Sequence, residues 1–404
     1  MTKTLDVDIW TPIKIGDCRL THRVVLAPLT RNRGSASEKH PLTWVPNDLM
    51  KKYYVERATP GGLLITEATP VSVRASGLFG IPGNFTDEQL EGWRFIVSAV
   101  HEKGGFIFSQ LWHQGRTTHS ALIGGQQPQS SSNVPMQGTF GWNGFEARPF
   151  EVPKPMSKDD IIDTQNDFVN AAKNAISAGF DGIEIHAGNG YLFDQFLHSN
   201  INTRTDEYGG SIENRCRFVL ETVEKLCKAI GASKVAVRLT PFGMLFGQTF
   251  GENRLEQWSY LCRELSKFGL AYVHLVEPRF DELKSASEKQ ETLKDMLTDG
   301  EEEVSLKPFR NALGPDTPLI SAGGFGPENA NEGLGNGTSD LVAFGRYFVA
   351  NPDLVARLKS GEPLYKWDRS RFYGPFEDNE IGYTVFPHRE FAKKGDIFKA
   401  QLAD

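Results

Sequence analysis

Eight short apolar runs recur along the chain, and each of them ends in small or polar residues. Nearly continuous hydrophobic runs of this length are typical of β-strands that are covered on both faces, as in a parallel sheet. The runs lie at residues 24–30, 63–68, 106–112, 182–188, 235–241, 272–278, 318–324 and 340–346. The sequence therefore predicts a buried parallel sheet of eight strands.

Amphipathic helical patterns fill the intervals between these runs. Thr86 and Gln89 have the spacing of a capping box, Ser157 opens a second helix, and residues 219–230 repeat apolar side chains at helical intervals. Eight strands that alternate with helices are what a (β/α)8 TIM barrel requires. The alternative is a doubly wound α/β sheet, which usually carries a G-x-G-x-x-G motif after its first strand, and residues 28–37 show no such motif. We therefore predict the barrel.

Three segments exceed a minimal barrel. Residues 114–156, after the third strand, are rich in Gly, Ser, Pro and aromatic residues and are expected to cross one mouth of the barrel. Residues 281–303, after the sixth strand, are highly charged and are expected to form a solvated helical insertion. Residues 361–404 form a polar tail. We expect residues 1–404 to form a single domain that includes all three segments.

The composition is that of an ordinary intracellular protein. Hydrophobic residues make up 39% of the 404 positions and the formal net charge is −7, so neither nucleic acid nor a membrane surface is an expected partner. The four cysteines are scattered, which argues against structural zinc and iron–sulfur centres, and we expect no metal. Neither a signal peptide nor a run of about 18 apolar residues is recognisable. We expect a cytoplasmic monomer or homodimer.

The ends of the last two strands indicate a phosphate site. Active sites of TIM barrels lie at the carboxyl ends of the strands, and the loops after strands seven and eight commonly bind phosphate. Here these strands end in Gly323-Gly324 and in Gly345-Arg346. Each glycine pair alone is more simply a tight turn. Together with an arginine, they favour a site where backbone N–H groups and a guanidinium contact an anion.

Arg238, which closes the fifth strand, has two possible roles. It could form a salt bridge with a structural carboxylate such as Glu67. It could instead face, together with Gln110, an electron-rich carbonyl edge of a ring ligand, as in a reduced flavin, with Thr30 at the opposite edge. The sequence permits both interpretations.

The stretch HAGNGY at residues 186–191 follows the fourth strand directly. His186 and Asn189 can both donate a hydrogen bond from neutral side chains. Two donors on one oxygen stabilise the charge that develops when an enolate forms beside a carbonyl. Tyr191 is protonated at neutral pH and can deliver a proton. Each residue alone could be structural, but the group at one strand end indicates a catalytic site.

These motifs together resemble the old yellow enzyme family, and fungal members most. The resemblance extends from about Pro12 to Tyr373, with strong stretches in AGFDGIEIHAGNGYLFDQFL (178–197) and NTRTDEYGGSIENR (202–215), and the run from His186 through Arg215 is very specific. It implies an FMN-dependent ene-reductase that takes electrons from NADPH or NADH. Many relatives have Ala-Gly-Asn where this chain has Ala322-Gly323-Gly324, so here the phosphate end depends more on backbone.

The resemblance also implies roles for individual residues. Tyr191 corresponds to the proton donor, and His186 and Asn189 to the pair that binds the carbonyl oxygen of the substrate. Trp112 and Tyr373 correspond to residues that line the substrate pocket. The expected FMN contacts are Pro28, Leu29, Thr30, Ala68, Gln110, His186, Arg238, Gly323, Gly324, Gly345 and Arg346.

The expected reaction is reduction of an α,β-unsaturated carbonyl compound or a similarly activated alkene. Hydride goes from FMN to the β-carbon, and Tyr191 protonates the α-carbon. Two alternatives remain open. One is a pathway-specific reductase or redox isomerase of secondary metabolism at the same site, with residues 241–254 and the two insertions deciding the substrate. The other is a flavin-binding protein without turnover.

Overall fold

The computed structural model describes residues 7–142, 145–249, 253–278, 304–387 and 390–392. The charged insertion predicted at 281–303 lies outside the described residues, as do residues 250–252 of the loop at 241–254. Within the described part of the chain, no helix is both long enough and apolar enough to cross a membrane.

Eight parallel strands close into a barrel, one from each predicted apolar run. The order around the barrel follows the chain, and the ring closes where the last strand pairs with the first. The prediction of a TIM barrel is therefore confirmed. The strands are β3 (Val24–Leu26), β6 (Leu63–Ile65), β8 (Phe106–Trp112), β13 (Gly182–His186), β14 (Val235–Leu239), β15 (Tyr272–Val276), β16 (Leu319–Ala322) and β17 (Leu341–Phe344).

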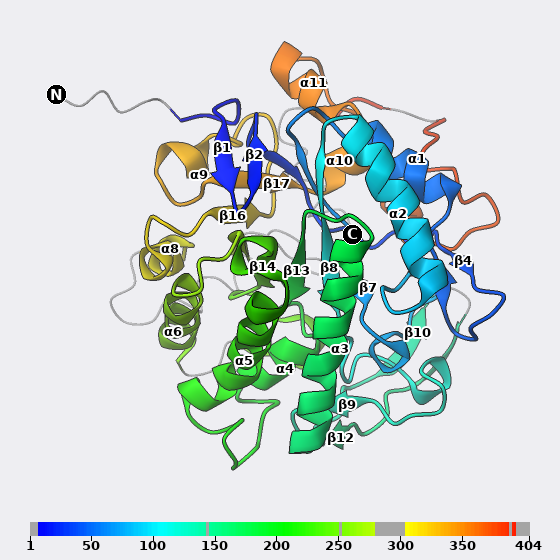
Figure 1. Cartoon of the computed structure of the whole chain (residues 1–404), viewed down its shortest axis with the longest axis vertical. Coiled ribbons are helices and arrows are strands. Elements are labelled where there is room, and N and C mark those ends of the chain that lie inside the picture. Colours follow the sequence, from blue (N-terminus) through cyan, green and yellow to red (C-terminus); the bar gives the residue numbers. More distant parts are fainter. Residues whose placement is uncertain (1–6, 143–144, 250–252, 279–303, 388–389, 393–404) are drawn as a thin grey trace.

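Helices cover the outside of the barrel, and α3, α5, α6 and α8 follow one another around it (Figure 1). Both predicted N-terminal caps are confirmed, because Thr86 forms a capping box with Gln89 and Ser157 forms one with Asp160. The helices are α1 (Asp48–Arg57), α2 (Asp87–Glu102), α3 (Lys158–Ser177), α4 (Leu192–Leu197), α5 (Ile212–Ile230), α6 (Arg254–Ser266), α8 (Lys307–Leu313), α9 (Glu332–Gly335), α10 (Arg346–Ala350) and α11 (Leu354–Ser360).

Apolar side chains fill the amino-terminal end of the barrel interior. Phe108, Ala236 and Tyr272 point inward there, and the hairpin of β1 (Ile13–Ile15) and β2 (Cys18–Leu20) packs against the same cluster. The turn of this hairpin needs glycine, because Gly16 has a φ of +48° and an added Cβ would lie 1.9 Å from the carbonyl oxygen of Ser233. Among the described residues, this end is therefore a packed plug, and the space for a ligand lies at the other end.

A layer of polar side chains lies above the plug. Successive side chains of a strand point to opposite faces, so the residue two positions after each plug residue also points inward. Gln110 on β8, Glu184 on β13, Arg238 on β14 and His274 on β15 occupy this level, and all four are buried. Glu184 is in register with Gln110, and Arg238 with His274. The polar layer thus forms the floor of the open end of the barrel.

The segment between β8 and α3 covers part of that open end. It contains β9 (Gln129–Ser130), β10 (Thr139–Trp142), β11 (Phe145–Pro149) and β12 (Lys154–Pro155), which pair in two small sheets. Phe140 and Leu122 from this segment pack in one cluster with Trp112 at the end of β8. The segment therefore closes over the mouth from one side. Two further pairs are short: β4 (Ser35–Ala36) with β5 (Trp44–Val45), and β7 (Thr69–Pro70) with β8.

Two buried arginines hold part of the carboxyl-terminal tail against the same mouth. Arg31 donates to the carbonyl oxygens of Phe372 and Gly382 at 2.9 and 2.7 Å, and Arg33 donates to that of Arg371 at 3.0 Å. Because Arg31 directly follows Thr30, these bonds place Tyr373 beside the end of β3.

The plug makes a prediction about stability. Phe108 is fully buried inside the barrel and its ring centroid lies 5.4 Å from that of Tyr272. Phe108→Ala should therefore lower the free energy of unfolding by about 3–5 kcal/mol, measured by chemical denaturation. Phe95, on the outer face of α2, is 49% exposed. Phe95→Ala is the matched control and should cost less than about 1 kcal/mol. Equal losses in the two variants would contradict a packed plug.

Candidate active site

Two adjoining cavities open at the carboxyl ends of the strands. The larger has a volume of about 500 Å³ and the smaller of about 120 Å³. Both are lined by Leu29, Arg238 and Tyr373, so they form one continuous site. Their combined size is in the range of pockets that bind cofactors and small molecules.

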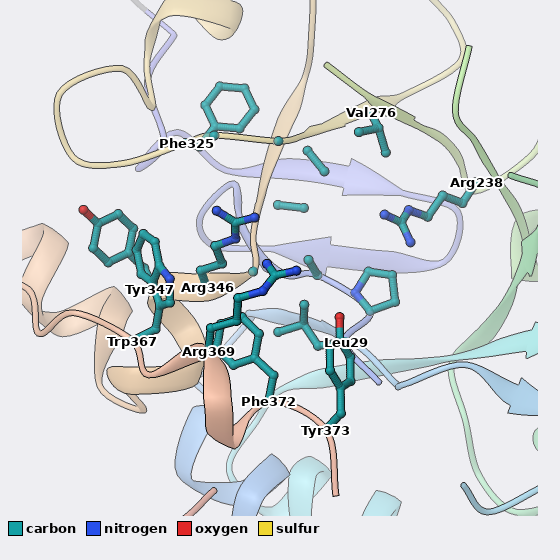
Figure 2. Close-up of a pocket in the computed structure, with 17 residues that line it drawn as sticks. Leu29, Arg238, Val276, Phe325, Arg346, Tyr347, Trp367, Arg369, Phe372 and Tyr373 are labelled. Atoms are coloured by element: carbon teal, nitrogen blue, oxygen red, sulfur yellow. The ribbon is translucent and has the colours of Figure 1, made fainter. Parts of the chain in front are cut away.

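The smaller cavity contains the predicted phosphate residues. Gly323, Gly324, Gly345 and Arg346 all line it. Gly323 and Gly324 have φ values of +118° and +68°, a conformation that side chains disfavour, so their backbone turns tightly around this space. Figure 2 shows the side chains of Arg346 and Arg369 next to each other at one end of the pocket, with Arg238 at the other.

Arg369 is a site residue that the sequence analysis missed. It comes from the short 3₁₀ helix at Arg369–Arg371 in the tail, and it lines both cavities. Nothing in the local sequence distinguishes it from other surface arginines. Only the fold of the tail, fixed by Arg31 and Arg33, brings it to the phosphate end.

The larger cavity brings together the other predicted residues. Those that line it are Pro28, Leu29, Thr30, Ala68, Gln110, His186, Asn189, Tyr191, Arg238, Arg346 and Tyr373. Trp112 does not line either cavity. Its ring packs perpendicular to that of Tyr191, with a centroid distance of 5.0 Å, so it supports the phenol.

Hydrogen bonds fix the loop after β13 in its conformation. Asn189 has a φ of +55°, and its N–H donates to Thr240 Oγ1 at 2.7 Å. The N–H of Gly190 donates to Asp194 Oδ2 at 2.9 Å. An added Cβ at Gly190 would lie 2.8 Å from the ring of Phe246, so this position also needs glycine. The loop thereby presents the side chains of Asn189 and Tyr191 toward the cavity.

His186 is neutral in this site. Burial lowers its pKa well below the ordinary value, and the nearby positive charge of Arg238 lowers it further. Its Nδ1 is buried and has no hydrogen-bond partner among the described residues. The imidazole ring contacts Tyr191 at a centroid distance of 5.0 Å. A neutral imidazole can donate a hydrogen bond to a ligand without bringing a second cation beside Arg238.

The contacts of two carboxylates bear on the role of Arg238. Glu67 accepts hydrogen bonds from the backbone N–H groups of Arg31 and Asn32, both at 3.2 Å, so it fixes the turn after Thr30. The positive charge of Arg238 lowers the pKa of Glu184, in the polar layer. The charge of Arg238 thus interacts with the polar layer that forms the floor of the mouth. In the sequence, Glu184 is marked only by its position as a glutamate within an apolar strand.

Comparison with known proteins identifies the family. Residues 8–365 match the family model described as NADH:flavin oxidoreductase / NADH oxidase. The chain is 48% identical to flavin oxidoreductase hxnT of Emericella nidulans, over 94% of this chain and 97% of that one. It is 42% identical to 12-oxophytodienoate reductase 2 of Arabidopsis thaliana, over 95% and 96% of the two chains.

Solved structures agree with this result. A structure of morphinone reductase in complex with tetrahydroNAD is 39% identical with a TM-score of 0.81, and covers 94% of this chain and 97% of its own. The old yellow enzyme homologue from Zymomonas mobilis is 34% identical with a TM-score of 0.82, and covers 95% and 100%.

The chain belongs to the old yellow enzyme family. The resemblance predicted from its motifs is therefore confirmed. As a member of this family the protein is an FMN-binding oxidoreductase with NAD(P)H as its reductant.

The residues of the mouth fit FMN. The guanidinium groups of Arg346 and Arg369 and the backbone of Gly323 and Gly324 suit a phosphate group. The buried, unpartnered Nδ1 of His186 offers a polar contact to a ligand. No group of three histidine, cysteine, aspartate or glutamate side chains that could hold a metal ion occurs among the described residues. The polar groups of the mouth thus match an organic, anionic cofactor.

The burial of Glu67 predicts a pH dependence of the stability of the protein. Its full burial raises its pKa from 4.5 to about 7, although two backbone hydrogen bonds and the charges of Arg31 and Arg33 oppose the shift. The folded state favours the protonated form of Glu67. The contribution of this group to the free energy of unfolding is therefore fully present below pH 4.5 and is lost as the pH rises through 7. The loss should be on the order of 3 kcal/mol.

Glu67→Gln removes this titration and keeps an acceptor for the two N–H groups. The melting temperature of the variant relative to that of the native protein should therefore rise between pH 5 and pH 8. Glu38→Gln, at an exposed position, serves as the control and should show no such trend. A difference for Glu67→Gln that stays constant with pH would show that Glu67 does not titrate in this range.

Proposed function

We propose that the protein is an ene-reductase, which reduces the carbon–carbon double bond of α,β-unsaturated carbonyl compounds or similarly activated alkenes with NAD(P)H. The observation that carries the proposal is that His186, Asn189 and Tyr191 line the same cavity as Gln110 and Arg238. Two neutral donors and one phenol thus lie next to the groups suited to the ring of FMN. When bound there, FMN supplies hydride transfer from the nucleotide to the β-carbon of the alkene.

His186 and Asn189 bind the carbonyl oxygen of the substrate in this mechanism. Negative charge develops on that oxygen as the β-carbon accepts a hydride, and donors already in place stabilise it. The lowered pKa of His186 keeps its ring neutral, so it acts as a hydrogen-bond donor and does not give up a proton in place of Tyr191. The rigid loop around Asn189 holds the second donor without reorganisation during the reaction.

Tyr191 supplies the proton that the α-carbon needs. Its ring contacts the rings of Trp112 and Phe246, at centroid distances of 5.0 and 5.7 Å. These contacts restrict the phenol to one orientation, so the hydroxyl can act as a general acid in a fixed place. The hydroxyl then regains its proton from solvent. Each double bond thus receives one hydride and one proton.

The relatives support a carbonyl substrate. Both 12-oxophytodienoate and morphinone, after which two of the relatives are named, are ketones by their names. The complex of morphinone reductase with tetrahydroNAD supports a nicotinamide nucleotide as the reductant. Because the nucleotide and the alkene would use the same cavity, we expect them to bind one after the other.

An anaerobic titration tests the proposal. NADPH should bleach the yellow FMN-bound protein, and 2-cyclohexenone should restore the colour with one equivalent of cyclohexanone formed. A redox isomerase would return the alkene isomerised, without oxidising the bleached protein. A binding protein without turnover would not bleach. Bleaching without recovery with any enone would contradict an ene-reductase.

The proposed roles of His186 and Asn189 can be tested by mutation. His186→Ala or Asn189→Ala should lower kcat/KM for cyclohexenone by about 10²–10³, because one donor to the developing oxyanion is lost. Neither variant should lose bound FMN. The measurement is steady-state kinetics together with the visible spectrum. A rate within a factor of three of the native rate in both variants would show that the oxygen binds elsewhere.

The proposed role of Tyr191 as the proton donor can be tested separately. Tyr191→Phe keeps the ring contacts with Trp112 and Phe246 and removes only the acid. In stopped-flow experiments, bleaching by NADPH should proceed at the native rate, whereas reoxidation by cyclohexenone should slow by about 10²-fold or more. Reoxidation at the native rate would assign the proton to another group.

A further inference from the structure

Glu184 is a buried carboxylate that the proposed reaction does not use. It points into the barrel from β13, two residues before His186, and it is completely inaccessible to solvent. Its Oε1 accepts from Gln110 Nε2 at 2.7 Å, and its Oε2 lies 2.9 Å from Nδ1 of His274. Both partners are themselves buried, so this is a closed network in the floor of the mouth.

The network carries one negative charge. Burial raises the pKa of Glu184, but His274, Arg238 and Gln110 together outweigh it, and the pKa lies below the ordinary value. Burial lowers the pKa of His274, and the neighbouring Glu184 carboxylate opposes this shift. Nδ1–H of His274 donates to the carboxylate. Arg238 adds a positive charge that also lowers the pKa of Glu184. Without it, a carboxylate in this place would be very unfavourable.

The charge of Glu184 also fixes the orientation of the Gln110 amide. An ionised carboxylate only accepts hydrogen bonds, so the atom of Gln110 that contacts it must be the amide nitrogen. The carbonyl oxygen of Gln110 is therefore the end left for the cavity, which Gln110 lines. The floor thus presents an acceptor from Gln110 and donors from Arg238.

This pattern matches one edge of the FMN ring. The pyrimidine edge of the isoalloxazine has one N–H donor at N3 between two carbonyl oxygens. We propose that Glu184 is a positioning residue for this edge: it orients Gln110 to accept from N3–H, and it offsets the charge of Arg238 in the same floor. The inference depends on FMN in the mouth, which family membership supplies, and not on ene-reduction, so its test needs no alkene.

The charge has a consequence for the reduction potential of FMN. Arg238 alone would stabilise the negative charge that the ring gains on reduction, and Glu184 opposes this effect. Glu184 should therefore hold the potential below the value that Arg238 alone would set. Removing the carboxylate should make bound FMN easier to reduce.

Two variants separate charge from positioning. Glu184→Gln removes the charge, and we expect the ratio of reduced to oxidised FMN at a fixed solution potential to rise about tenfold, or about 30 mV for two electrons. Glu184→Asp keeps the charge but withdraws the carboxylate from Gln110. The midpoint potential should then stay near the native value, while the Kd for FMN rises about tenfold or more because the bond to Gln110 is lost.

Glu221→Gln is the matched control. Glu221, on α5, also accepts from a glutamine amide, that of Gln165 at 3.1 Å, but it lies on the outside of the barrel. The midpoint potential is measured by equilibration of the FMN-bound protein with a redox dye, and the Kd by titration of the apoprotein with FMN. The control should keep the native Kd and the native potential.

Several outcomes would overturn the proposal. A native potential in Glu184→Gln would show that the charge does not act on the ring. Should that variant not fold, Glu184→Asp and Gln110→Leu still decide the positioning role. In the double variant, Glu184→Asp should add no further loss of FMN affinity to that of Gln110→Leu. Additive losses would mean that Glu184 does not act through Gln110.

Discussion

The buried carboxylate of Glu184 is the constraint on which the active end of the barrel depends. An ionised group without access to water is tolerated only if donors and a counter-charge surround it. β8 and β15 supply those donors through Gln110 and His274, and β14 supplies the cation through Arg238. Four strands therefore have to keep their register at this level, which makes the floor of the mouth rigid.

The same floor separates the apolar, closed end of the barrel from the open end that holds the cavity. Below it, apolar side chains and the β1–β2 hairpin close the barrel. Above it, the loop after β13 and the tail held by Arg31 and Arg33 form the walls of the cavity. FMN held there would be bound by Gln110 and Arg238 of the floor, and the loop residues His186, Asn189 and Tyr191 line the same cavity. That arrangement suits a substrate that needs its oxygen bound and its α-carbon protonated away from the hydride donor.

The sequence predicted the barrel and most of the cavity lining because both depend on local patterns. Apolar runs mark strands, Thr86 and Ser157 mark helix starts, and the strand ends mark the mouth. The network of Glu184 could not be predicted, because its partners are 74 and 90 residues away in sequence. Arg369 was missed because it reaches the mouth only through the fold of the tail. Trp112, expected to line the substrate pocket, packs against Tyr191, which itself lines the cavity, and this contact depends on side-chain direction that spacing does not reveal.

The account is tested most directly by the stereochemistry of one reduction. 2-Methyl-2-cyclohexenone would be reduced with a nicotinamide nucleotide that carries deuterium at the transferred position, and separately with unlabelled nucleotide in D₂O. If the ring of FMN lies on one side of the alkene and Tyr191 on the other, nucleotide deuterium appears at the β-carbon and solvent deuterium at the α-carbon, on opposite faces. Addition of both to the same face, or solvent deuterium at the β-carbon, would contradict the proposed arrangement of the mouth.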